Sequence, residues 1–308
     1  MTTIDTESST EKLIRLQEET LFFLNMVKNS QAVRVGDNQI LTRLFTGQKI
    51  FVDASDISVS PALIMDGYWE REVTTLLTKI LRPSDCFIDL GANMGYFGIV
   101  AGTVIRGDEG GSIHMIEANP ELVPLIFKSI NVTGLLGTAV VANFAVTDTV
   151  GEVQLQVVKD LLGSSSLNDL DTQFRLVNSS TSAVGFEVAE KVTVPSITLD
   201  EYAAMESMPK VDLVKMDIEG YEEHAYRGMQ RIVAENRDNL RLLLEFTPTR
   251  YPDSEGFYHQ LAADFTHVLG LDPNNGSLIP LTTYDELLAM SASGYVMVLA
   301  TNQQEIHL

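Results

Sequence analysis

Short apolar runs recur along this chain, and most of them are followed by a segment whose apolar residues have helical spacing. After the run at 86–88, for example, Phe97, Val100 and Val104 fall near one face of a helix. Regular alternation of strand and helix patterns favours a parallel sheet covered by helices. The runs that predict strands are 86–88, 112–116, 139–146, 211–216 and 240–246, with a closing strand at 295–300.

Helices are predicted between these runs, from Pro120 to about Ile130, after Asp217 to about Val233, and near 257–265. A proline at 120 suits the first turn of a helix. One segment interrupts the alternation, because 152–158 and 186–194 have the pattern of a hairpin. Residues 159–183 between its strands are rich in Ser, Asn and Asp. Loops of that length are usually functional or disordered.

A glycine-rich turn follows the first predicted strand. Its glycines are spaced Gly-x-x-x-Gly-x-x-Gly, not Gly-x-Gly-x-x-Gly as in a dinucleotide site. Such a turn lets a ligand approach the backbone, and the next helix begins with free N–H groups and a partial positive charge. An acid at the strand end would repel a pyrophosphate but hold an ammonium group. The sequence is Asp89-Leu90-Gly91-Ala92-Asn93-Met94-Gly95-Tyr96-Phe97-Gly98.

S-adenosylmethionine carries an ammonium group and a carboxylate but no phosphate, so the turn predicts a methyl-donor site more than a nicotinamide site. A turn that only packs a strand against a helix is the alternative. Asn93 takes the place of a middle glycine, and Asn tolerates left-handed backbone better than other non-glycine residues. The cofactor-binding residues expected here are Asp89, which would contact the methionine end, with Gly91, Ala92, Asn93 and Gly95.

A second acid ends the next strand. Glu117 follows the run at 112–116, and a carboxylate at this position can accept hydrogen bonds from both ribose hydroxyls. The third strand places Asn143 at its carboxyl end, where an amide could bind the edge of an adenine ring. We expect these two residues to bind the cofactor, together with Ala118, Asn119 and Ala145 beside them.

The fourth strand, 211–216, ends at Asp217. Ligands in open α/β sheets bind outside the carboxyl ends of the strands. Asp89, Glu117, Asn143 and Asp217 would therefore lie along one edge of the sheet. Four polar strand ends on a shared edge are hard to explain by packing, so Asp217 is also expected to contact the cofactor.

Asp217 and Glu219 are the predicted catalytic residues. Methyl transfer from a sulfonium ion can be accelerated largely by positioning the acceptor, and a hydroxyl acceptor also needs a base. Asp217 is first by its position, whereas Glu219 and Glu222 either contact the acceptor or cap the next helix. His224 lies a turn into that helix. No Asn-Pro-Pro-Tyr-like sequence, common in methyltransferases of planar amines and nucleobases, follows the strand.

An ordered series of motifs resembles the FkbM-type S-adenosylmethionine-dependent methyltransferases. Each motif is weak alone, but the ordered set is specific and spans about Gly67 to Phe246. Ala118 replaces the proline that is usual in the second acidic motif of the family. The matching segments are 67–70, 87–96, 117–120, 145–148, 163–167, 194–200 and 215–222.

The resemblance implies a class I methyltransferase fold, which is a Rossmann-like α/β fold. Its seven-stranded, mostly parallel sheet has helices on both faces and an antiparallel last strand. It also implies an enzyme that methylates a hydroxyl of a sugar, a glycan precursor or a secondary metabolite. A methyltransferase of nitrogen or a carboxylate is the nearest alternative. Asp89 and the glycine spacing disfavour a nicotinamide-dependent oxidoreductase, and the acids at 217 and 219 disfavour a non-catalytic S-adenosylmethionine-binding protein.

Composition limits the partners. A net charge of −21 disfavours binding to nucleic acid phosphates or to an anionic membrane surface. The first residues lack the pattern of a secretory signal, and no apolar stretch reaches the roughly 18 residues of a membrane span. The single cysteine, Cys86, excludes a disulfide scaffold and suits the cytoplasm. No Cys/His cluster has metal spacing, and Asp217 with Glu245 lacks a third ligand, so we expect no metal.

Residues 10–28 have amphipathic helical spacing, and Ser8 with Glu11 forms a plausible capping box. Such a helix could form a homodimer, cover the site or dock on its own domain. One alternating pattern with one site, in 308 residues, predicts a single catalytic domain. We assign it to 67–308, preceded by a helical and β extension at 1–66.

Overall fold

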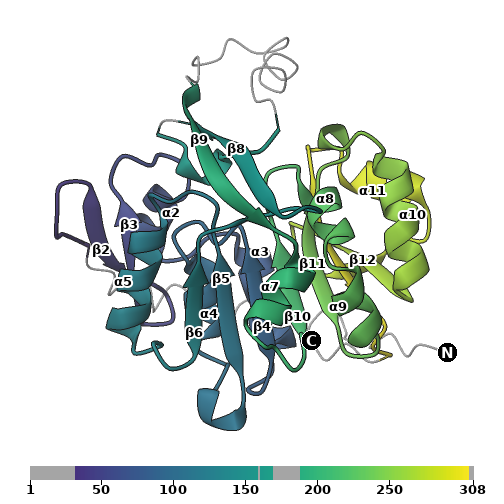
Figure 1. The fold of residues 1–308 in the computed structure, drawn as a ribbon, viewed down its shortest axis with the longest axis horizontal. Helices are drawn as coiled ribbons and strands as arrows, with labels where there is room; N and C mark the ends of the chain where they lie inside the picture. The colour runs from purple at the N-terminus through teal and green to yellow at the C-terminus, as the bar shows by residue number, and fades with distance from the viewer. Residues whose placement is uncertain (1–31, 159, 169–187, 305–308) are drawn as a thin grey trace.

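The computed structural model describes residues 32–158, 160–168 and 188–304 and arranges them around one large sheet with helices on both sides (Figure 1). Its order is β13-β12-β14-β11-β10-β4-β5-β6, and the five strands from β11 to β6 are parallel. The strands are β4 (Cys86–Leu90), β5 (Ser112–Ile116), β6 (Ala139–Ala142), β10 (Leu213–Met216), β11 (Arg241–Phe246), β12 (His267–Leu271), β13 (Leu278–Pro280) and β14 (Val296–Thr301).

The two faces of the sheet bury two separate hydrophobic clusters, because successive strand residues point to opposite sides. Phe87 and Leu213 belong to one cluster, and Ile88 and Val214 belong to the other. Helices α3 (Arg71–Ile80), α4 (Tyr96–Ala101) and α5 (Val123–Thr133) cover the first face. The second face is covered by α7 (Leu199–Met205), α8 (Glu222–Arg227), α9 (Gln230–Glu235), α10 (Ser254–Asp264) and α11 (Tyr284–Met290).

The expected α/β sheet is confirmed, with eight strands in place of seven. The additional strand, β13, pairs with β12 in an antiparallel hairpin at the edge of the sheet. Its turn is closed by backbone hydrogen bonds from Asp272 N to Ser277 O at 2.9 Å and from Gly276 N to Asp272 O at 2.8 Å. β13 contains only the three residues Leu278–Pro280. Alternation of side chains over so few residues cannot be recognised in the sequence.

The third predicted strand, 139–146, is divided in two. β6 ends at Ala142, and β7 (Ala145–Val146) leaves the large sheet to pair with another strand. Asn143 lies at the break, and its Nδ2 donates hydrogen bonds to the carbonyl oxygens of Glu117 at 2.8 Å and Ala118 at 3.0 Å. These bonds turn the chain out of the sheet and bring residues 144–146 across its edge.

The helix predicted from Pro120 begins later, at Val123. Asn119 Oδ1 accepts a hydrogen bond from Glu121 N at 3.0 Å, which closes a turn around Pro120. The proline in the first turn of α5 is Pro124. The sequence pattern therefore located the helix but not its first residue.

The helix predicted after Asp217 is interrupted, and forms α8 and α9. Gly228 lies between them and its backbone passes close to the neighbouring chain. A Cβ at this position would lie 2.2 Å from the carbonyl oxygen of Thr147. This close approach requires a glycine at the junction of the two helices.

Two small sheets accompany the large one. β1 (Val33–Arg34), β2 (Gln39–Arg43) and β3 (Lys49–Asp53) form a meander after which α2 (Ser60–Met65) follows, and Phe51 N donates to Ser129 Oγ of α5 at 2.9 Å. The predicted hairpin is confirmed, and its strands are β8 (Gly151–Val158) and β9 (Val188–Ile197). Both strands lie at the top of Figure 1. The 3₁₀ helices in the described segments are η1 (Gly107–Glu109), η2 (Leu162–Ser164) and η3 (Pro248–Arg250).

Candidate functional site

The parallel strands bring several of the predicted site residues to one edge of the large sheet. Asp89 on β4 is in register with Lys215 on β10 and with Met115 on β5. The three strands therefore end side by side, and the residues that follow them meet. Gly91 N donates to Ile116 O at 3.0 Å, and Asp217 N donates to Leu90 O at 3.2 Å.

The turn after β4 has the left-handed backbone that its sequence predicts. Gly91, Asn93 and Gly95 have φ angles of 73°, 52° and 85°. At Gly91 the space is also limiting, because a Cβ would lie 1.9 Å from the carbonyl oxygen of Asp217. The close contact between these two strand ends depends on a residue without a side chain.

Glu117 fastens the turn to the end of β5. Its Oε2 accepts a hydrogen bond from Asn93 N at 2.7 Å, and its Oε1 accepts one from Asn119 N at 2.8 Å. The residue is 6% exposed. Burial raises the pKa of Glu117 to about 7, although the hydrogen bonds from Asn119 and Asn93 lower it. The carboxyl group is thus fixed in orientation and partly protonated at neutral pH.

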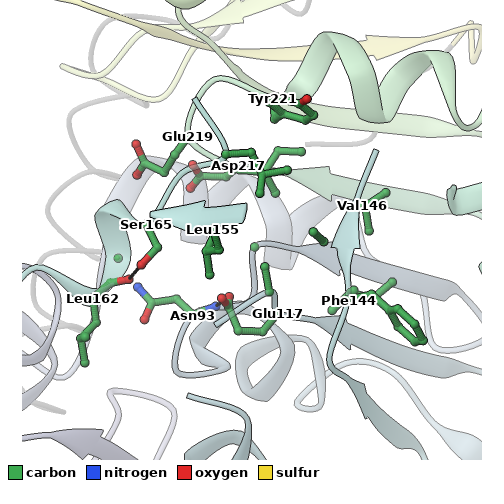
Figure 2. A pocket seen from close by; sticks show the side chains of 17 residues that line it. Asn93, Glu117, Phe144, Val146, Leu155, Leu162, Ser165, Asp217, Glu219 and Tyr221 are labelled. Atoms are coloured by element: carbon green, nitrogen blue, oxygen red, sulfur yellow. Dashed lines mark hydrogen bonds between the residues drawn. The ribbon is translucent and has the colours of Figure 1, made fainter. Parts of the chain in front are cut away.

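A pocket of about 560 Å³, open at its mouth, lies against this turn. Figure 2 shows Asn93 and Glu117 on one side and Asp217 with Glu219 across from them. Apolar side chains complete the wall, from Ile116 to the hairpin. The lining residues that sequence reasoning had not named for the site are Ile116, Phe144, Val146, Leu155, Ile218 and Tyr221, whereas Leu162, Gly163, Ser165 and Leu167 come from the long polar loop at 159–183, whose motif resembles the family's.

A second pocket, of about 420 Å³, shares Gly91, Asn93, Gly163 and Asp217 with the first. Its other lining residues include aromatic rings and the amine of Lys215. They are Val59, Trp69, Ala92, Met94, Tyr96, Phe97 and Lys215. Asp217 therefore stands where the two pockets meet.

Three of the predicted residues lie behind the pocket walls. Asn143 binds the Glu117 and Ala118 carbonyls, and the neighbouring Phe144 and Ala145 line the pocket in its place. Asn119 is fully buried and lines neither pocket. Gly95 immediately precedes α4 and is also absent from both walls. Of the remaining predicted cofactor residues, Gly91, Ala92, Asn93, Glu117, Ala118, Ala145 and Asp217 line one pocket or both.

Asp89 is likewise fully buried beneath the turn and lines neither pocket. Both of its carboxyl oxygens lack a hydrogen-bond partner among the described residues. Its Oδ1 lies 3.9 Å from Nζ of Lys215, which is 3.2 Å from Asp217 Oδ2. Burial raises the pKa of Asp89 to about 6, while Lys215 lowers it. The lysine thus connects the buried acid to the acid at the pocket wall.

The other acids near Asp217 are bound to partners of their own. Glu222 Oε1 accepts hydrogen bonds from Ile218 N at 2.8 Å and Gly220 N at 3.2 Å, so this side chain caps the turn before α8. Glu219 forms an ion pair with Arg250, in which Glu219 Oε2 lies 2.7 Å from Arg250 Nη1. Burial raises the pKa of Glu219 to about 7, and Arg250 lowers it. Glu222 is therefore structural, and Glu219 is held by an arginine.

His224 lies away from both pockets. Its Nδ1 is 3.0 Å from Asp148 Oδ2, and its ring stacks on Tyr221 with the centroids 4.3 Å apart. It lines neither pocket, whereas Tyr221 lines the first. The geometry therefore makes His224 a partner of Tyr221 and not a group at the site.

The residues present fit S-adenosylmethionine. Glu117 and Asn93 offer oxygen acceptors for hydroxyl or ammonium hydrogens, and Asn93 Oδ1 is buried without a hydrogen-bond partner among the described residues. Apolar walls at Ile116, Phe144 and Val146 suit a planar ring. Among the described residues, no lysine or arginine lines the first pocket, which disfavours a ligand with phosphates.

The model of the FkbM methyltransferase domain matches residues 89–279, which is more than half of the chain. The chain belongs to the FkbM methyltransferase family. It is an S-adenosylmethionine-dependent methyltransferase with a class I fold, and S-adenosylmethionine is its cofactor. No curated protein matches the sequence.

Several solved structures resemble this FkbM methyltransferase over most of its length. Methyltransferase FkbM from Methylobacillus flagellatus KT is 12% identical, over 93% of this chain and 60% of its own, with a TM-score of 0.43. Methanocaldococcus jannaschii Trm5 in complex with adenosine is 11% identical, over 88% and 57%, with a TM-score of 0.41. A TehB-like S-adenosylmethionine-dependent methyltransferase from Corynebacterium glutamicum is 11% identical, over 79% and 94%, with a TM-score of 0.38.

Two further findings concern partners. No helix in the described part of the chain is both long and apolar enough to cross a membrane. Within the same residues, no group of three or more His, Cys, Asp or Glu is arranged to hold a metal ion. The predicted dimerisation helix at 10–28 lies outside the described residues, and the absence of a metal stays a prediction.

Proposed function

We propose that this FkbM methyltransferase transfers the methyl group of S-adenosylmethionine to a hydroxyl oxygen, with Asp217 as the general base. The observation that carries the proposal is the position of Asp217 at the junction of the two pockets. A base must reach the acceptor beside the donor, and this is the carboxylate that borders both spaces. When bound, the cofactor supplies an electrophilic methyl group on a positively charged sulfur.

In this proposal the first pocket receives the nucleoside part of the cofactor. Glu117 accepts hydrogen bonds from the ribose hydroxyls, and Phe144 and Ala145 contact the adenine ring. Asn93 contributes a side-chain oxygen that has no hydrogen-bond partner within the described part of the chain. Gly91, Ala92 and Ala118 allow close approach of the backbone. Asp89, Gly95, Asn119 and Asn143 support these groups from behind the wall.

Asp217 is a better candidate for the base than Glu219 because it borders both pockets, whereas Glu219 lines only the first. Glu219 is engaged by Arg250 at 2.7 Å, and Arg250 is also 3.5 Å from Glu245. Burial and the charge of Asp217 raise the pKa of Glu245 to about 9, so Glu245 is protonated at neutral pH and cannot accept a proton. Asp217 is paired with Lys215 at 3.2 Å and is 20% exposed, close to the 21% of Glu219, so its place on the wall of both pockets is what distinguishes it.

The second pocket suits the acceptor. Trp69 and Tyr96 offer aromatic surface there, and its polar groups at Asp217 and Asn93 suit hydroxyls. A sugar, a glycan precursor or a polyhydroxylated secondary metabolite has this combination of apolar ring faces and hydroxyl groups. Val59 also lines this pocket, so the extension at 1–66 that we assign before the catalytic domain at 67–308 contributes to the site.

Incubation of the protein with methyl-labelled S-adenosylmethionine and a panel of glycans and small metabolites tests this proposal. We expect label on an oxygen of a neutral polyhydroxyl compound, identified by mass spectrometry and by NMR of the methyl group. Label on nitrogen or on a carboxylate oxygen would replace the proposed acceptor class but keep the donor site. Transfer to nucleic acid would overturn the assignment of the second pocket.

A further inference from the structure

Glu70 has an unusual conformation next to the second pocket. It is the residue before the first turn of α3, and its φ of 40° places a non-glycine residue in the left-handed region. Its Oε2 is buried and has no hydrogen-bond partner among the described residues. Strained backbone of this kind persists where the surrounding structure enforces it, and it is concentrated at functional sites.

The carboxyl group of Glu70 interacts with the Lys215–Asp217 pair. Burial and the charge of Asp217 raise the pKa of Glu70, while Lys215 and Tyr295 lower it, so its carboxyl group is within electrostatic range of both members of the pair. Lys215 Nζ also lies 4.5 Å from the centroid of the Phe97 ring. Although burial lowers the pKa of Lys215, Asp217, Asp89 and Glu70 raise it above its ordinary value, so the amine is charged.

We call Glu70, Asp89, Lys215 and Asp217 the Lys215 cluster. It contains three carboxyl groups and one ammonium group, and two of its members line the second pocket. When the acids are ionised, the cluster has an excess of negative charge that the lysine does not neutralise. Arg250, the other cation close by, is engaged by Glu219 and Glu245.

We infer that Glu70 gives this enzyme its preference for the charged donor over the uncharged product. S-adenosylmethionine and S-adenosylhomocysteine share every other ionisable group and differ by one methyl group and the positive charge on sulfur. A carboxylate near the reaction site whose charge is not neutralised by a cation therefore attracts the positive sulfur of the donor. It has no such attraction for the product, whose sulfur is uncharged. The inference rests on the proposed position of the donor beside Asp217. Glu70 is then a specificity residue that acts through the Lys215 cluster. Because the product is bound less tightly than the donor, its release is favoured.

Coulomb's law gives the size of the effect. A unit charge about 8 Å from a sulfonium ion, at an effective dielectric constant of 20 to 40, changes the affinity on the order of 5- to 30-fold. A change of that size in the ratio of two dissociation constants is much larger than the error of a calorimetric measurement. The amino, carboxylate and adenosine groups occur in both ligands, so contacts with them leave the ratio unchanged.

The preference should increase with pH. Burial, with repulsion from Asp217, raises the pKa of Glu70 to about 7, and burial raises that of Asp89 to about 6, so both lose protons between pH 5.5 and pH 8. Sulfonium charge does not titrate in this range. The other charged or titratable groups that face the cluster, from α4, the 217–222 turn, β11, η3 and the segment before β14, are Tyr96, Glu219, Glu222, Glu245, Arg250 and Tyr295.

The test measures dissociation constants for S-adenosylmethionine and S-adenosylhomocysteine by calorimetry, without any acceptor. Glu70→Gln removes the charge and keeps the shape, and Glu72→Gln removes an acid two residues further along, in the first turn of α3 and outside the cluster. We expect Glu70→Gln to reduce the preference for S-adenosylmethionine roughly 5- to 30-fold at pH 8. Glu72→Gln should leave the ratio within twofold of wild type, and wild type at pH 5.5 should approach the Glu70→Gln ratio.

A third variant separates charge from folding. Glu70→Gly relieves the left-handed strain and removes the carboxyl group, so we expect wild-type or higher thermal stability with the same loss of preference. An unchanged ratio in both Glu70 variants would overturn the inference, and so would equal weakening of both ligands. Failure of wild-type protein to bind either ligand would instead overturn the proposed donor site.

Discussion

At the scale of single residues, the sequence predicts which side chain ends a strand but not the direction in which it turns. Glu117 and Asp217 were expected at the pocket from their positions, and both line it. Asn143 also ends a strand, yet its amide satisfies two backbone carbonyls and Phe144 faces the pocket. Glu70 was part of a recognised motif, but neither its left-handed backbone nor its buried oxygen is evident from the residues around it in the sequence.

The base assignment predicts a difference between two isosteric substitutions. Asp217→Asn keeps the shape of the side chain and removes the proton acceptor, so we expect turnover to fall about 10²- to 10⁴-fold with donor affinity changed far less. Glu219→Gln should retain most of the turnover, because Arg250 already engages that acid. Steady-state rates with the acceptor found by label transfer check this. Full activity of Asp217→Asn with an inactive Glu219→Gln would exchange the two roles.

At the scale of elements, local signals were sufficient for the strand–turn–helix at 86–101, because its glycines and apolar spacing are contained in one short segment. The contacts that hold the segment after η2 against the 217–220 turn were not predictable in the same way. Ser166 Oγ donates to Glu219 O at 2.7 Å, and Asn168 Nδ2 donates to Gly220 O at 2.9 Å. These contacts join segments more than 50 residues apart in the chain. Each segment alone shows only a polar loop.

The glycine turn predicts opposite outcomes for two substitutions of Asn93. Its φ of 52° is accessible to glycine without strain and strongly disfavoured for a β-branched residue. We expect Asn93→Gly to retain most of the affinity for S-adenosylhomocysteine and Asn93→Val to lose nearly all of it. Calorimetry with thermal melting as a check on folding measures both. Equal affinities in the two variants would show that backbone conformation at 93 does not govern the site.

At the scale of the whole molecule, the acidic composition and the fold act together. The net charge is −21, and several acids are buried around the site in addition to the two hydrophobic clusters. Composition indicated the excess of acid but not its location, because burial of Asp89, Glu117 and Glu222 follows from the convergence of strand ends. The protein thus keeps groups at its centre that bind protons more tightly than they do in an unfolded chain.

This arrangement predicts that stability rises on mild acidification. Burial raises the pKa of Glu117 from 4.5 to about 7, and those of Glu70 and Glu219 to similar values. Between about pH 4.5 and 7 the folded protein therefore holds protons that the unfolded chain has lost, so the free energy of unfolding falls as pH rises through this window. We expect a higher Tm at pH 6 than at pH 8 by differential scanning calorimetry. An equal or lower Tm at pH 6 would contradict the assigned protonation.

The central claim is that the cofactor binds at the edge of the sheet where Glu117 and Asp217 face each other. Calorimetric titration of S-adenosylhomocysteine into wild type, Glu117→Ala and Glu121→Ala tests it most directly, since Glu121 is an exposed acid four residues further along. We predict one site per chain in wild type, unchanged affinity in Glu121→Ala, and a loss of about 1–3 kcal/mol in Glu117→Ala because the ribose hydroxyls lose their acceptor. Wild-type affinity in a folded Glu117→Ala variant would contradict the account.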